Sequence, residues 1–150
     1  ENYGSILIGD GLNVPPSLTR IIPHRLALPN CKQLHKNLQV EWEVFGPAIT
    51  FLLSGKIDED DYMAFGLSGS DSKSQMSGAD VAVTYIDGHL GYTVDYKIDA
   101  PAPCVNVLGV NKGVCKDIET GGQDNFQLHT YTRDDGINKI TFRRSLISCE

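Results

Sequence analysis

The side chains of this 150-residue chain that could carry chemistry include four cysteines, Cys31, Cys104, Cys115 and Cys149. They contain no Cys-x-x-Cys pair, and no histidine stands at a zinc-finger distance from them, which argues against a structural zinc site. Two disulfides are the better interpretation, and they predict an oxidising compartment, so that the chain is secreted or at the cell surface. Of the three possible pairings we favour Cys104 with Cys115, closing a short loop, and Cys31 with Cys149, tying together the two ends of the sheet region.

Tyrosines offer a binding hypothesis. A phenol ring presents a flat apolar face and a polar tip, and such a face can stack on a sugar ring. The alternative is that at least half of these tyrosines are ordinary core residues or cross-strand pairs. The candidates come from neighbouring predicted strands and are Tyr85, Tyr92, Tyr96 and Tyr131.

Catalytic motifs do not occur in the sequence. We find no Gly-x-Ser-x-Gly elbow, no His-Glu-x-x-His helix and no phosphate loop. Asp80 with Asp87 or Asp95 could form an acid–base pair, but sequence does not show their separation, and a carboxylate at the start of a strand more often binds backbone N–H groups. We therefore expect no enzymatic activity.

Metal and polyanion binding are also disfavoured. The acidic run from Asp58 to Asp61 lacks the EF-hand spacing, so we interpret it as a solvated turn and expect no metal site. A net charge of −6 argues against nucleic acid, whose binding rests on phosphate neutralisation by Lys and Arg. No apolar run approaches the roughly 20 residues of a membrane span. The chain has no leader sequence, so we expect it to be part of a longer precursor.

Met76 is the only large apolar residue in a polar connection between two apolar segments, residues 62–67 and 80–86. A thioether in this position could fill a gap, contact a ligand or bind a metal centre. Of the four histidines, only His129 lies within a predicted strand. A histidine in a strand is more often a surface or hydrogen-bonded side chain than a ligand.

Strand patterns organise the rest of the chain. Val40, Trp42 and Val44 alternate with polar residues, which predicts a strand with one buried face and places Trp42 in the core. Asp87-Gly88 is the strongest hairpin signal. Residues 100–122 form an insertion that a Cys104–Cys115 bond would hold rigid. Similar patterns predict further strands at residues 49–53, 62–67, 80–86, 92–97, 126–131 and 140–142.

These patterns predict an all-β fold, an antiparallel sandwich of two sheets like that of immunoglobulins, with a disulfide-closed loop insertion. We place the sandwich at residues 38–150. Residues 1–37 contain Pro15, Pro16, Pro23 and Pro29, which restrict helix and interrupt strand pairing. We expect these residues to form an extended arm that packs on the domain, with room for one short strand at residues 5–8.

The stretch YMAFGLSGSDSKSQMSGADVAVTYIDG, joined downstream to QLHTYTRDDGINKITFRRSLISC, resembles the DOMON domain family. The shared pattern is a Trp strand, a strand with an aromatic residue and Gly, a Met-x-Gly-Ala-Asp-Val segment, an acidic Gly turn and a closing Phe-x-Arg-x-Leu strand. These elements correspond to Trp42, Phe65-Gly66, residues 76–81, Asp87-Gly88 and residues 142–146. The resemblance covers about residues 38–149 and looks strongest to the DOMON domains of insect cuticle proteins, where a DOMON domain follows DM13 domains.

For such a protein the resemblance implies an extracellular role in organising and protecting chitin. It also implies an alternative, because cytochrome members of the family hold b-type haem between a Met and a His. Met76 falls on that Met position. The family His lies beyond the closing strand, where this chain has none, so His129 would have to replace it.

Three functions are therefore carried forward. The first is a non-catalytic module that binds chitin or another polysaccharide and works with neighbouring domains of its parent chain. The second is a haem-binding electron-transfer domain with Met76 and His129 as axial ligands. The third is a structural spacer. We expect no cofactor, with haem b as the alternative.

Overall fold

A computed structural model describes residues 28–146 of the chain. These residues form strands joined by turns and loops, together with one 3-10 turn that follows β9. The elements are β1 (Asn30–His35), β2 (Leu38–Phe45), β3 (Ala48–Lys56), β4 (Met63–Leu67), β5 (Ala79–Asp87), β6 (Leu90–Ile98), β7 (Val105–Val107), β8 (Val110–Lys112), β9 (Val114–Lys116), η2 (Asp117–Glu119), β10 (Gln127–Asp134) and β11 (Ile137–Ser145).

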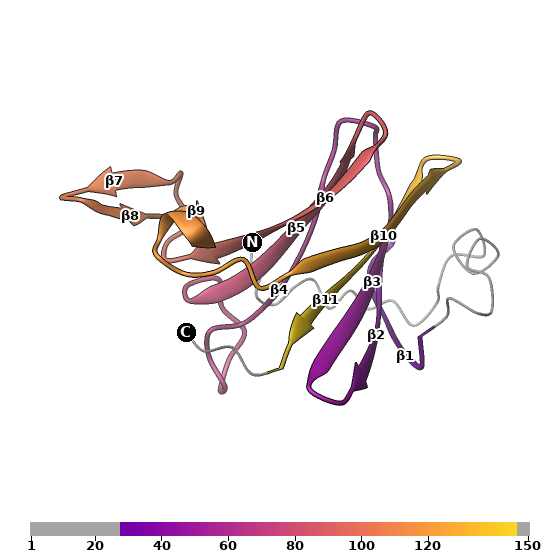
Figure 1. The fold of residues 1–150 in the computed structure, drawn as a ribbon, viewed down its shortest axis with the longest axis horizontal. Coiled ribbons are helices and arrows are strands. Elements are labelled where there is room, and N and C mark those ends of the chain that lie inside the picture. Colours follow the sequence, from indigo (N-terminus) through magenta and orange to yellow (C-terminus); the bar gives the residue numbers. More distant parts are fainter. Residues whose placement is uncertain (1–27, 147–150) are drawn as a thin grey trace.

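Two antiparallel sheets make up the body of the domain (Figure 1). The larger has the strand order β1-β2-β3-β11-β10 and the smaller β4-β5-β6-β9. Contacts of β10 with β6, β11 with β5 and β3 with β4 join the two layers. A two-stranded ribbon, β7-β8, projects from one side of this body. The predicted antiparallel sandwich is thus confirmed.

The main core fills the space between the two sheets. Leu53, Ile140 and Phe142 are fully buried there. The Phe142 ring lies 5.4 Å from that of Phe51, measured between centroids. Trp42 is half-buried against the same cluster, so the predicted buried face of this strand is confirmed only in part, and Val44 at its far end is exposed. Because successive side chains of a strand point to opposite faces, one face of each strand supplies this core.

A second, smaller cluster lies on the outer face of the four-stranded sheet. Ala82 belongs to the main core, whereas Ala79 and Val81, on the opposite face of β5, are buried with Ile98 of β6. We call this side of the sheet the outer face. It is apolar over much of its area, which is unusual for a sheet face that does not point into the sandwich.

The turns and the arm depart from prediction in detail. Asp87 pairs with Leu90, so the predicted Asp87-Gly88 turn lies one residue later, at Gly88-His89. Gly88 has a φ of 60°, whereas His89 keeps an ordinary negative φ, so only one central position uses the glycine-like conformation. Residues 30–35, which we assigned to the arm, form β1 and pair with β2, so the sheet begins earlier than expected. The rest of the predicted arm, with the strand at residues 5–8, lies outside the described residues.

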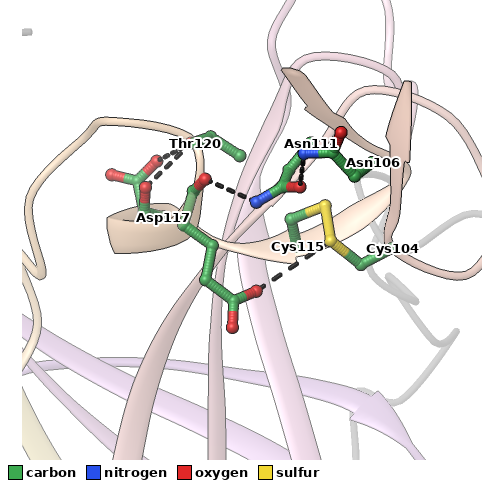
Figure 2. The surroundings of a disulfide bond; sticks show 7 residues. Cys104, Asn106, Asn111, Cys115, Asp117 and Thr120 are labelled. Carbon is green, nitrogen blue, oxygen red and sulfur yellow. Dashed lines mark hydrogen bonds between the residues drawn. A yellow bond between two sulfur atoms is a disulfide. The ribbon is translucent and has the colours of Figure 1, made fainter. Parts of the chain in front are cut away.

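The insertion is a braced lobe, as predicted. Cys104 is disulfide-bonded to Cys115. Figure 2 shows the polar contacts around this bond: the Asn106 side-chain amide donates to Asn111 Oδ1 (3.0 Å), and the Asn111 amide donates to the Glu119 carbonyl (2.8 Å). The β7-β8 ribbon is thereby tied to η2.

The second predicted disulfide joins Cys31 to Cys149. Cys31 is exposed on β1 and has no disulfide partner among residues 28–146, and partial burial together with the nearby Glu41 carboxylate raises the pKa of its thiol. Cys149 lies outside the described residues, so the pairing of Cys31 with Cys149 stays a prediction. Across residues 28–146, no helix is long and apolar enough to cross a membrane.

Candidate functional site

Tyrosines gather on the outer face. Tyr85 of β5 is directly opposite Tyr92 of β6, and their rings stack with centroids 5.0 Å apart and an interplanar angle of 16°. Tyr96, further along β6, pairs with Val81 and points to the same face. Three of the four tyrosines predicted from sequence therefore share one surface.

A groove of about 530 Å³ runs along this face, and we call it the outer-face groove. Its lining combines aromatic and aliphatic side chains with acidic side chains from the β3–β4 loop and the end of β5, and we call the acidic part the rim. A smaller depression of about 230 Å³ continues from it and shares four of its residues. The lining consists of Tyr62, Val83, Tyr85, Ile86, Tyr96 and Val114, with Glu59, Asp60, Asp61, Asp87 and Gly88.

Tyr62 is the groove residue that sequence reasoning missed. It stands one residue before β4, is 58% exposed, and lines both depressions. The signal was present, because Tyr62, Ala64 and Gly66 alternate onto the outer face and the two small residues leave space beside the ring.

The fourth predicted tyrosine is elsewhere. Tyr131 of β10 packs against the main core, and its hydroxyl donates to the His89 carbonyl (3.0 Å). Its ring lies over Gly91 of β6, where a β-carbon would collide with it. Tyr131 thus joins the two sheets and does not share a surface with Tyr85, Tyr92 and Tyr96.

The charge around the groove is mostly negative. Glu59, Asp60, Asp61 and Asp87 line it, and the described lining includes no Lys or Arg. The backbone N–H of Asp61 donates to the Asp58 carbonyl (3.2 Å), which folds the acidic segment into a turn. Lys116 of β9 is a cation at the edge of this face, where it is the register partner of Tyr96 of β6. The predicted solvated acidic turn is therefore also the rim of a groove.

Met76 and His129 are not brought together. Met76 is half-buried in the outer-face cluster with Ala79, Val81 and Ile98. His129 is exposed in β10 of the other sheet, at a bulge between Leu128 and Thr130. Axial ligands must approach one iron from opposite faces of the haem. A thioether packed on the outer side of one sheet and an imidazole on an edge strand of the other do not form that arrangement, so these residues do not fit haem as a pair.

Asp80 and Asp95 do come together, inside the sandwich. Asp95 is 2% exposed, and the backbone N–H of Asn125 donates to its carboxylate (2.9 Å). The pKa of Asp95 is raised to about 8, mainly by burial and then by a hydrogen bond to Asp80, while the Asn125 contact opposes the shift. Arg144 forms an ion pair with Asp80. A protonated Asp95 that donates to an ionised Asp80 satisfies this geometry.

In this pair Asp95 is buried, whereas the Asp80 side chain is 27% exposed. The Arg144 guanidinium also lies 4.9 Å from the centroid of the Phe126 ring, so the pair belongs to a polar cluster that joins β5, β6 and β11 to the segment before β10. Asp87 is exposed and lies apart from it, on the outer-face groove. Among residues 28–146 no group of three or more His, Cys, Asp or Glu side chains could hold a metal ion.

A larger depression, of about 860 Å³, lies on the other side of Tyr62. Its charged lining is mixed, with Lys56, His35 and Arg133 beside Asp58 and Asp61. Arg133 already donates to Asn138 Oδ1 (2.7 Å) and to the Ile57 carbonyl (3.1 Å). This depression lacks the clustered aromatic rings of the outer-face groove, which is therefore the better candidate for a binding site.

The fold and the groove together define an antiparallel β-sandwich domain with a disulfide-braced lobe and an aromatic surface on one sheet. The sequence profile of the DOMON domain matches residues 34–150, so the chain belongs to the DOMON domain family, as its motifs indicated. It is 31% identical over 154 residues to Protein Skeletor of Drosophila melanogaster, in isoforms B/C and in isoforms D/E. The match covers 99% of this chain but 19% and 10% of those two relatives, so the chain spans a fifth or less of their length.

Proposed function

We propose that this chain is a non-catalytic, extracellular module that binds chitin or a related β-linked glycan through the outer-face groove. The observation that carries the proposal is that Tyr62, Tyr85 and Tyr96 line one groove on an outer sheet face. A sugar ring has an apolar face of C–H groups and a rim of hydroxyls. Aromatic rings bordered by carboxylates match both parts, since the rings contact the apolar face and the carboxylates accept hydrogen bonds from the hydroxyls.

Three further observations support the setting. The Cys104–Cys115 bond is typical of an oxidising, extracellular environment. The Asp80–Asp95 pair supports a non-catalytic role, because Asp95 is buried and Asp80 is held in an ion pair with Arg144. The short share of the Skeletor sequences that the chain covers supports neighbouring domains of a parent chain as partners. The resemblance to DOMON domains of cuticle proteins favours chitin among the glycans.

Sedimentation with insoluble chitin tests the proposal. The purified chain is expected in the pellet at levels well above albumin, with Tyr62→Ala reducing its affinity about 3- to 10-fold, the size expected for one lost aromatic contact. Tyr62 is a suitable target because its exposure limits the cost to folding.

Phe45→Ala is the matched control, because Phe45 is an aromatic residue 82% exposed at the β2–β3 turn of the other sheet. Its loss should leave binding unchanged. If the wild-type chain sediments no better than albumin, the proposal fails and the structural spacer is favoured. If Phe45→Ala and Tyr62→Ala weaken binding equally, the glycan does not use the groove.

A further inference from the structure

We propose that the outer-face groove prefers glycans with free, protonated amino groups, that is, partly deacetylated β-linked amino-sugar polymers, over the fully acetylated polymer. This inference rests on the proposed function and names the class of glycan that the groove selects. It is carried by the juxtaposition of tyrosine rings and carboxylates in the lining of one groove.

The aromatic part of the groove is suited to cations. Tyr62, Tyr85 and Tyr96 line it. Tyr92 stacks on one face of the Tyr85 ring, so this ring presents its remaining surface to the groove. An ammonium group near the face of a tyrosine is attracted by the ring quadrupole, whereas a neutral acetamide gains only van der Waals contact and weak hydrogen bonds.

The acidic part lies next to these rings. Glu59, Asp60 and Asp61 are consecutive and exposed, and Asp87 approaches the groove from the end of β5. Exposed carboxylates are ionised at neutral pH. Two cations flank this surface without lining the groove, namely Lys116 beside Tyr96 and, when protonated, His89 in the β5–β6 turn. Cations are therefore outnumbered where a ligand would lie.

A neutral glycan makes little use of this arrangement. Hydroxyls and acetamide N–H groups can donate to one or two carboxylates, but four negative charges around a neutral ligand remain unbalanced. A polymer with several ammonium groups balances them, and each exposed pair contributes a modest, salt-sensitive attraction. Several such pairs acting on one chain should give a preference of about 10-fold.

Isothermal titration calorimetry on the whole chain tests the preference. The two ligands are glucosamine oligomers and N-acetylglucosamine oligomers of equal length, measured at mildly acidic pH and at low and high salt. We expect the amino oligomer to bind about 10-fold more tightly at low salt, and we expect this ratio to fall toward one at high salt.

Two quadruple variants with the same change in net charge decide whether the rim is responsible. The rim variant is E59Q/D60N/D61N/D87N. The control variant, E43Q/D71N/D134N/D135N, removes four exposed carboxylates that do not line the groove. The rim variant should lose the preference, because its affinity for the amino oligomer falls far more than its affinity for the acetylated oligomer. The control variant should retain the preference.

The outcomes separate this inference from the proposed function. If both oligomers bind wild type equally, or if the rim variant keeps the preference, the inference is overturned while glycan binding stands. If neither oligomer binds, the proposed function fails as well. An oligolysine of the same charge is the remaining probe: if it binds with rim dependence while the amino oligomer does not, the groove takes a cationic peptide and the inference is overturned.

Discussion

Tyr92 covers one face of the Tyr85 ring, with the ring centroids 5.0 Å apart, yet of the two only Tyr85 lines the outer-face groove. Tyr92 is therefore a positioning residue, whose stack holds Tyr85 in the orientation that a ligand meets. This division of roles follows from the register, which places the two residues directly opposite each other on β5 and β6.

The stack gives a prediction for Tyr92. Tyr92→Ala should weaken glycan binding about 3-fold although Tyr92 does not line the groove, because Tyr85 loses its support. Tyr92→Phe keeps the ring and should bind like wild type. Dissociation constants from calorimetry check both variants. A loss in Tyr92→Phe equal to that in Tyr92→Ala would show that the hydroxyl, and not the stack, is what matters.

Asp95 predicts how stability depends on pH. Its pKa is raised from 3.8 to about 8 in the folded chain, mainly by burial and then by its bond to Asp80. Between these values the folded chain keeps a proton that the unfolded chain has released, so the free energy of unfolding falls as pH rises. The stabilising contribution is complete below about pH 4 and is lost as pH passes about 8.

Asp95→Asn tests this prediction. The amide keeps an acceptor for the Asn125 N–H and can donate to Asp80, so the variant should match wild type at low pH. Above pH 8 it should be more stable by about 1–3 kcal/mol, because no charge is buried. Urea unfolding at several pH values measures the difference. The control is Asp99→Asn, an exposed carboxylate after β6, which should follow the wild-type curve. If the free energies of unfolding of wild type and Asp95→Asn depend on pH in the same way, the raised pKa is not that of Asp95.

Alternation and turn chemistry were enough to predict the sandwich. Val40 and Phe142 lie on the core face as their patterns predict, and the Asp135-Gly136 turn has positive φ at both positions (50° and 73°). Glu41 shows where alternation misleads. It points away from the main core yet is buried, because its carboxylate accepts hydrogen bonds from the Leu28 N–H (2.9 Å) and the Gln39 amide (2.8 Å). A hydrophobic pattern does not report hydrogen bonds of that kind.

The groove was only partly predictable, for a related reason. Period-two alternation says which residues share a face of one strand, but not which face of which sheet turns outward. Tyr131 was therefore grouped with Tyr85, although a glycine at position 91 lets its ring lie between the sheets. Tyr62 alternates with Ala64 and Gly66 onto the outer face, but alternation does not report that acidic residues of the β3–β4 loop and tyrosines of β5 and β6 line one groove with it.

Met76 predicts a spectroscopic result. Because it packs with Val81 and Ile98 while His129 lies on the other sheet, we expect no Soret band that depends on Met76 after incubation with haem. Absorption spectra of wild type, Met76→Leu and His129→Ala check this. Leu preserves the apolar packing, so a band lost only in Met76→Leu and His129→Ala would restore the haem hypothesis and overturn our interpretation of the packing.

Leu108 predicts a stabilising substitution. It is fully exposed at the tip of the β7-β8 ribbon and has a φ of 53°, followed by Gly109 at 87°. This two-residue turn favours Asn at its first position, and a left-handed Leu costs about 1–2 kcal/mol. Leu108→Asn should therefore stabilise the ribbon by about 0.5–1 kcal/mol, since no buried contact is lost. Amide hydrogen exchange in β7 and β8 measures the gain. Leu108→Thr is the control that separates backbone conformation from polarity. Thr is polar, as Asn is, but its β-branched side chain disfavours positive φ. Equal protection in the Asn and Thr variants would refute the conformational argument.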